Sequence, residues 1–257
     1  MTEVDFRSCA FINDHSISKH LLSHALIETI DLRDCNVTHH VLNLLTKCFP
    51  RLSNLYLGRT ESKLEPHESL QEFFPQHNCH PNYFLRKSNL KLLSLEAILR
   101  VSDRNESAVA IFIQSLIHSS NQIRQLDLSR NVAIDNLSFI DCFKTIHSLI
   151  LYDIQPKAVE TSIDAICSLK TLVLLDLSYN RRNQDAPNYS NPTLTLAKLA
   201  RNLPKLLSLD ISGTNLAGSY SFDRDEEILY YKKTFFIDDD EFVVIVCCTG
   251  KKKILDF

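Results

Sequence analysis

The side chains that could carry chemistry in this 257-residue sequence are its ten histidines and eight cysteines, together with its serines and acidic residues. The densest group of metal-ligand side chains is His77-Asn78-Cys79-His80. A structural zinc site needs four converging nitrogen or sulfur ligands, and no second Cys/His pair lies nearby in the sequence. We therefore interpret this group as a polar loop, and we expect neither a metal site nor a cofactor.

The glycine content argues against the common catalytic loops. Only four glycines are present, at positions 58, 213, 218 and 250. No G-x-G-x-x-G, no phosphate-binding loop and no G-x-S-x-G motif is found. A Ser-His-Asp trio can be drawn in any sequence that is rich in these residues, so its mere presence is no evidence of a triad. We expect no catalytic residues and no enzymatic activity.

Charge and hydropathy limit the class of partner. The net charge is −3 and the pI is near 6.4, which gives no general attraction to nucleic acid. The first residues are too polar for a secretory signal, and the apolar run from Phe242 to Cys248 is too short to span a membrane. The cysteines lack the spacing of a disulfide framework. These features predict a cytoplasmic or nuclear protein without nucleic-acid or membrane partners.

One apolar pattern recurs along the chain. Its clearest form is L-x-x-L-x-I-x-x-T-x-L, from Leu206 to Leu216, in which apolar and polar residues alternate as in a half-buried strand. Copies begin at Ile27, Leu52, Leu90, Ile123, Ile146, Leu172 and Leu206. The shorter intervals between copies match the leucine-rich repeat period of about 20–29 residues. Cys35 occupies the turn position, where its side chain is expected to satisfy backbone groups.

The fold class that follows is α/β, a leucine-rich repeat solenoid with a curved parallel sheet and helices on its convex side. We predict strands centred near residues 31, 56, 94, 127, 150, 176 and 210. Helices are predicted over 38–48, 105–118, 157–168 and 195–201, and a long polar insert over 61–88. Residues 1–24 carry no repeat and form an N-terminal cap with a short helix at 16–24. Residues 25–218 form the solenoid of about seven repeats.

Residues 219–257 form an atypical tail in which leucine nearly vanishes. One interpretation is a terminal strand, with Phe242 to Val246 pairing to the last repeat and capping the solenoid. The other is a poorly ordered sequence foreign to the repeats, from a truncated or mis-joined coding region. We favour the second.

The outward residues of stacked strands form columns on the concave face, where solenoids bind partners. The candidate protein-binding residues there are Asp31, Tyr56, Asp127, Ile150, Tyr152, Asp176 and Asp210. One interpretation is a mildly acidic binding surface with apolar anchors. The alternative is that the aspartates reflect a local L-D-L-S habit of such repeats, in which Asp and Ser pair with each other.

Several segments resemble repeats of the Zer/Zyg family of substrate receptors. These are 48–59 (CFPRLSNLYLGR), 148–154 (SLILYDI), 175–178 (LDLS) and 207–213 (LSLDISG). The resemblance covers about residues 25–218 and is nearest to the Zer branch. It implies a non-catalytic adaptor of cullin 2 RING ubiquitin ligases with elongin C and cullin 2 as partners, and a monomer within that complex. In the family, an armadillo-like domain recognises N-terminal glycine degrons.

Two parts of that family pattern are not evident. No clear elongin-binding box is seen in residues 1–24, so we expect recruitment of elongin C to be weak or absent. Only 39 residues (257 − 218) follow Gly218, so we expect an incomplete receptor that does not bind glycine degrons. The alternative function is a general intracellular leucine-rich repeat interaction module unrelated to ubiquitin. An extracellular repeat receptor is disfavoured by the missing signal peptide and cysteine-rich caps.

Overall fold

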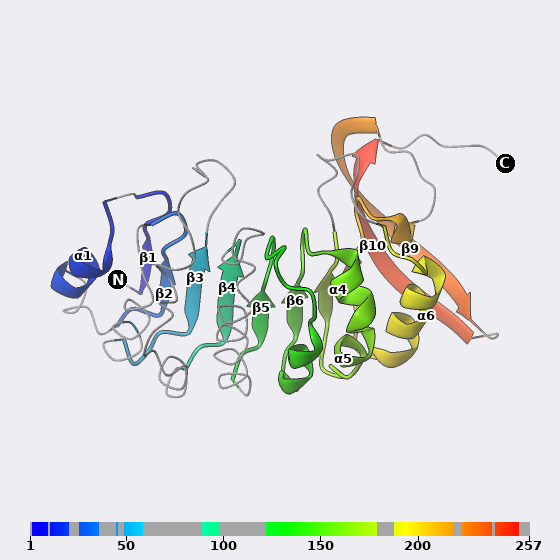
Figure 1. Ribbon diagram of the computed structural model, residues 1–257, viewed down its shortest axis with the longest axis horizontal. Helices are drawn as coiled ribbons and strands as arrows, with labels where there is room; N and C mark the ends of the chain where they lie inside the picture. Colours follow the sequence, from blue (N-terminus) through cyan, green and yellow to red (C-terminus); the bar gives the residue numbers. More distant parts are fainter. Residues whose placement is uncertain are drawn as a thin grey trace.

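The chain folds around one sheet of short strands that lie side by side in the order of the sequence (Figure 1). The computed structural model describes residues 2–9, 11–20, 26–35, 45, 49–58, 89–97, 122–178 and 188–217, and the backbone of 223–237 and 240–251. The first eight strands are β1 (Glu3–Asp5), β2 (Thr29–Asp31), β3 (Asn54–Gly58), β4 (Leu92–Glu96), β5 (Gln125–Asp127), β6 (Ser148–Ile150), β7 (Leu174–Asp176) and β8 (Ser208–Asp210). Each is parallel to the next. This open parallel sheet confirms the predicted solenoid.

Strands β2 to β8 lie at all seven predicted places, because the apolar doublet of each repeat fixes which face is buried. Leu55, Leu126 and Leu175 each lie opposite an apolar residue of the neighbouring strand, and each is at most 1% exposed. The second residue of the doublet is equally buried, since Leu128, Leu177 and Ile211 are 0%, 3% and 1% exposed, and Leu209, the first residue of the last doublet, is 2% exposed. Together these side chains form a continuous core that no single repeat could bury alone.

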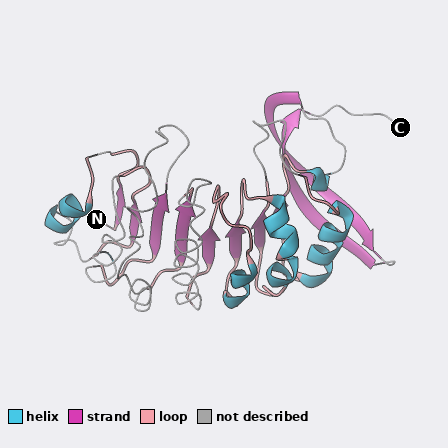
Figure 2. Ribbon diagram, in the orientation of Figure 1, coloured by secondary structure: helices cyan, strands magenta, loops and turns pink. Residues whose placement is uncertain are grey.

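The helices pack beside the later strands (Figure 2). They are the 3-10 turn η4 (Ser138–Cys142), α4 (Pro156–Thr161), α5 (Ile163–Cys167), α6 (Pro192–Asn202) and the 3-10 turn η5 (Asn215–Ala217). The helix predicted over 157–168 is therefore broken at Ser162, although Val159, Ile163 and Ile166 face inward as expected. Asn191 begins α6, because its Oδ1 accepts the Leu194 N–H and Pro192 follows it.

The N-terminal segment contributes a strand that the sequence analysis did not predict. β1 pairs in parallel with β2, with Val4 opposite Ile30, so residues 3–5 extend the repeat sheet. A helix, α1 (Asp14–His20), lies within the segment for which a short capping helix was expected, and its Ile17 is 1% exposed.

The tail forms a long antiparallel pair, β9 (Asp223–Ile237) and β10 (Asp240–Lys251). β10 adds to the sheet in parallel with β8, with Val246 opposite Leu209 and Cys247 opposite Asp210. This contact with the last repeat is of the kind that the first alternative describes, although of the residues from Phe242 to Val246 only Val246 lies opposite β8.

Some predictions fall outside the described residues. They concern the insert at 61–88 with its His77–His80 group, the helix at 105–118, and the helix at 38–48 except for the buried Leu45. Among the helices that are described, none combines the length and the apolar character that crossing a bilayer requires.

Candidate functional site

The strand register aligns the predicted concave residues in one column. Pairing runs from Asp5 through Asp31, Tyr56, Ser94, Asp127, Ile150 and Asp176 to Asp210. Tyr152 lies two residues beyond Ile150, on the flank of the column. The structure thus brings together all seven candidate residues, and it adds Asp5 at the N-terminal end.

The aspartates of the later repeats hold the turn that follows their strand. Asp176 Oδ1 accepts the backbone N–H of Ser178 at 2.8 Å and its hydroxyl at 2.5 Å. Asp210 and Ser212 repeat this arrangement at 2.9 and 2.6 Å. The D-x-S spacing therefore has a local structural purpose, which supports the alternative interpretation of these carboxylates.

Asp127 makes the same turn and also links two repeats. Its Oδ1 accepts the N–H and the hydroxyl of Ser129 at 2.9 and 2.5 Å. Its Oδ2 accepts the hydroxyl of Ser94, which is 1% exposed, at 2.9 Å. This bond gives the buried Ser94 hydroxyl an acceptor and ties β4 to β5.

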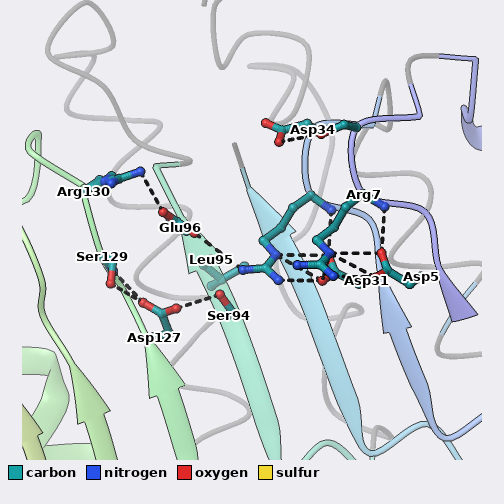
Figure 3. A network of polar contacts seen from close by, with 12 residues as sticks. Asp5, Arg7, Asp31, Asp34, Ser94, Leu95, Glu96, Asp127, Ser129 and Arg130 are labelled. Atoms are coloured by element: carbon teal, nitrogen blue, oxygen red, sulfur yellow. Dashed lines mark hydrogen bonds and ion pairs between the residues drawn. The ribbon is translucent and has the colours of Figure 1, made fainter. Parts of the chain in front are cut away.

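The first repeats place arginine where the later ones place serine (Figure 3). The guanidinium of Arg33 donates to both carboxylate oxygens of Asp31, at 3.1 Å from Nε and 2.6 Å from NH2. Arg7 repeats this fork on Asp5 at 3.1 and 2.7 Å, and holds the pKa of Asp5 at about 2. The Arg7 Nε also lies 3.4 Å from Asp31, so the pairs form one ladder.

Glu96 extends this ladder across the sheet. Its Oε1 accepts from Arg130 at 3.0 Å, and its Oε2 lies 3.8 Å from Arg33, two strands away. Gly58 lies on the strand between Arg33 and Glu96, in register with Glu96, and has no side chain that would separate the two. Burial raises the pKa of Glu96, an effect that the two arginines oppose.

Two tyrosines lie beneath this ladder. The guanidinium of Arg33 is 5.2 Å from the ring centre of Tyr56, and that of Arg130 is 5.2 Å from the ring centre of Tyr152. Both distances suit a cation–π contact. Sequence analysis proposed the tyrosines as apolar anchors but missed Arg7, Glu96 and Arg130. Because alternate residues of a strand share a face, Glu96 could have been predicted to lie on the same face as Ser94. Arg130 lies in the turn after β5, where this alternation makes no prediction.

Two of the turns are closed by a buried or half-buried side chain at the same place in the repeat. Asn131 is fully buried, and its amide donates to the carbonyls of Leu95 and Leu128, both at 2.8 Å. Cys35 occupies the same place, and its thiol donates to the carbonyl of Phe6 in the preceding repeat at 3.0 Å. The predicted role of Cys35 is therefore confirmed.

The two halves of the concave face differ in charge. Around β1–β4 the carboxylates of Asp5, Asp31 and Glu96 are paired with arginines. Within the described residues, no Lys or Arg pairs with the carboxylates of the column on β5, β7 and β8. Burial raises the pKa of Asp176 against its hydrogen bonds from Ser178, and the charges of Asp210 and Asp127 add to the rise. This half presents an acidic strip beside Ile150 and the partly exposed Leu174.

The described residues offer no evident catalytic arrangement on this face. Among them, no group of three or more His, Cys, Asp or Glu side chains could hold a metal ion. The ionisable groups are engaged in ladders and turns that shape the sheet.

Comparison with known proteins identifies the type of repeat. Residues 114–234 match the family model described as Zer-1-like, leucine-rich repeats. The chain is 36% identical over 100 residues to the Protein zer-1 homolog of Drosophila melanogaster, which covers 38% of this chain and 12% of that protein. It is 33% identical over 116 residues to Zyg eleven-related protein 1 of Caenorhabditis elegans, covering 45% of this chain and 12% of that protein. The resemblance to Zer/Zyg repeats is thereby confirmed.

Proposed function

We propose that these Zer-type repeats are the non-catalytic scaffold of a substrate-receptor subunit of a cullin 2 RING ubiquitin ligase. The observation that carries the proposal is the match of residues 114–234 to Zer-1-like repeats, together with the open parallel sheet that these repeats form (Figure 1). Elongin C and cullin 2 are the partners that the resemblance to the family implies. The aligned regions cover 12% of each relative, so the activity of those whole proteins is extended to this chain only as a proposal.

The concave half over β5–β8 is the part of the scaffold that we assign to protein contact. Ile150 and Leu174 lie on its outward side, and Leu174 is 36% exposed. Protein interfaces combine such apolar centres with a polar rim, which the D-x-S turns of β5, β7 and β8 supply here. The arginine-paired half over β1–β4 is electrostatically satisfied within itself and has less to offer a charged partner.

The test is a chimera. The repeats of the Drosophila zer-1 homolog that align with residues 122–217 are replaced by these residues, and elongin C and cullin 2 are measured in the captured complex. The unmodified zer-1 homolog is measured in parallel, and we expect the chimera to capture as much of both proteins as it does. A chimera that has the circular dichroism and melting temperature of the unmodified protein but captures neither would contradict the ligase assignment. It would favour the general interaction module.

The concave face is tested in the same chimera with substrate turnover as the readout. Ile150→Glu combined with Leu174→Glu places two charges at the centre of the proposed contact. The matched control is Lys157→Glu, an exposed change on α4. We expect turnover to fall with the concave pair and to persist with the control. Equal turnover in all three proteins would show that this face makes no contact that the receptor needs.

A further inference from the structure

Cys9 and Cys35 occupy equivalent positions in neighbouring repeats. Each lies four residues beyond the paired Asp5 and Asp31. The parallel ladder continues past the strands, because Ser8 N–H donates to the carbonyl of Arg33 at 2.9 Å. The two turns also have the same backbone shape, with φ of 60° at both Ser8 and Asp34.

One acceptor brings the two cysteines together. The carbonyl oxygen of Phe6 accepts the Cys9 N–H at 3.0 Å and the Cys35 thiol at 3.0 Å. The Cys35 sulfur therefore lies within about 6 Å of the Cys9 nitrogen. Burial raises the pKa of the Cys35 thiol to about 11, an effect that the hydrogen bond of the Cys9 backbone opposes. Strands in a sheet are about 4.8 Å apart, inside the range of about 4.4–6.8 Å between Cα atoms that disulfides require.

Both side chains are free and partly exposed. The other free cysteines of the described residues lie elsewhere, with Cys142 at the end of η4 and Cys167 at the end of α5. Of these four described cysteines, only Cys9 and Cys35 lie at equivalent places in the turns that follow adjacent strands. We propose that Cys9 and Cys35 are a redox-sensitive pair that a low-molecular-weight disulfide such as oxidised glutathione converts to a reversible cross-strand disulfide.

The chemistry balances in two exchanges. The Cys9 thiolate attacks one sulfur of oxidised glutathione, which forms a mixed disulfide and releases one glutathione thiolate. The Cys35 thiolate then attacks the Cys9 sulfur, which closes the protein disulfide and releases the second glutathione. The protein loses two protons and two electrons, and one glutathione disulfide is reduced to two thiols. Cys35 exchanges its hydrogen bond to Phe6 for a covalent link between β1 and β2.

The link would fasten the first strand of the solenoid to the second. Terminal elements of a solenoid have a neighbour on one side only, so they open more readily than inner repeats. A disulfide across this junction restricts that opening. The pair therefore stabilises the N-terminal end of the sheet under oxidising conditions and releases it under reducing ones.

The experiment treats the full reduced chain with oxidised glutathione and maps its cysteines by non-reducing peptide mass spectrometry. We expect a Cys9–Cys35 linked peptide as the main product, reversed by dithiothreitol, and a higher melting temperature of the oxidised protein. Cys9→Ser and Cys35→Ser should each lose the linked peptide and the rise in melting temperature, and retain glutathione on the remaining cysteine. Cys35→Ser keeps a hydroxyl donor for Phe6, so the turn should still form.

The matched control is Cys142→Ser, which should change neither the yield of the Cys9–Cys35 linked peptide nor the rise in melting temperature on oxidation. Glutathione on both Cys9 and Cys35 without a link between them would overturn the proposal. So would equal yields of links to Cys142 or Cys167, because random pairing needs no special geometry. A linked peptide that forms without any change in the melting temperature would overturn the proposed stabilisation of the N-terminal end.

Discussion

Gly58 has a φ of +128°, which residues with a side chain rarely adopt. A Cβ at this position would overlap the backbone carbonyl oxygen of Glu96 on the next strand. We expect Gly58→Ala to lower the free energy of unfolding by about 2–4 kcal/mol, from backbone strain and overlap together. Urea unfolding measures it, with Ser208→Ala on β8 as a control that should change stability by less than about 0.5 kcal/mol. A loss as small as that of the control would show that the two strands separate easily here.

The buried amide of Asn131 is expected to contribute to the stability of the repeats. Its amide satisfies carbonyls of two successive repeats, so Asn131→Ala leaves two buried acceptors without these donors. We expect a loss of about 1–3 kcal/mol in the free energy of unfolding, the cost of one buried acceptor, because the Leu128 carbonyl still accepts the backbone N–H of residue 131 whereas the Leu95 carbonyl loses the amide. The comparison is Cys142→Ala, a partly exposed side chain at the end of η4, which should cost far less. Similar losses in the two variants would mean that water replaces the Asn131 amide.

Some properties of single residues follow from their place in the repeat, and others arise only when the repeats stack. The role of Cys35 was predictable because it follows from its place in the repeat, and its bond to Phe6 confirms it. The left-handed backbone at Ala97 and Arg130 was not, since neither residue type favours φ values of 51° and 60°. The stacked repeats impose this conformation, and a single repeat read alone does not show it.

At the scale of the elements, the sequence predicts strands β2 to β8 because each carries the apolar doublet that must face the core. β1 escaped prediction because its core residues are Val4 and Phe6 rather than leucines, although their spacing and that of Cys9 match the repeat beginning at Ile27. The helix predicted over 157–168 is interrupted at Ser162, whose hydroxyl accepts the Leu137 N–H at 2.7 Å. That contact with another repeat could not be read from local periodicity.

The column of aspartates on β5, β7 and β8 leads to a pH prediction. The folded pKa of Asp176 is raised above its unfolded value by burial, and the charges of Asp127 and Asp210 add to this. The folded state therefore binds the proton more tightly, so the contribution of Asp176 to stability is largest below its unfolded pKa and declines as pH rises through the folded pKa. We expect Asp176→Asn, which keeps an acceptor for Ser178, to be more stable than the native chain at pH 7.

The gain from Asp176→Asn should shrink as the pH is lowered toward 4, because the native carboxyl then becomes protonated in the folded state. Urea unfolding of both proteins between pH 4 and 7 measures the difference. The control is Asp135→Asn, at an exposed position away from the strands, which should show no such trend. A gain that stays constant with pH would show that the amide acts through packing or hydrogen bonding rather than through charge.

In the described sheet, each repeat strand pairs with its neighbours in the sequence, which makes the solenoid nearly one-dimensional. Hydrogen bonds run from each turn to the next strand, as from Leu151 N–H to the carbonyl of Asp176 and from Leu177 N–H to that of Asp210, both at 2.8 Å. A defect should therefore weaken adjacent repeats most and distant ones least. The candidate surface over β5–β8 depends on this same order, because its residues come from four successive strands.

Leu177→Ala tests this coupling. The side chain is 3% exposed, so its truncation should leave a cavity and cost about 2–5 kcal/mol in the free energy of unfolding. Hydrogen exchange should show the largest loss of protection at the amides of Leu151 and Leu177. The amide of Leu32, which donates to the carbonyl of Tyr56 at 2.9 Å, should lose the least, because it lies five strands away from β7. An equal loss at all three amides would mean that the solenoid unfolds as one unit, and a cost below about 1 kcal/mol would mean that the neighbouring repeats close the cavity.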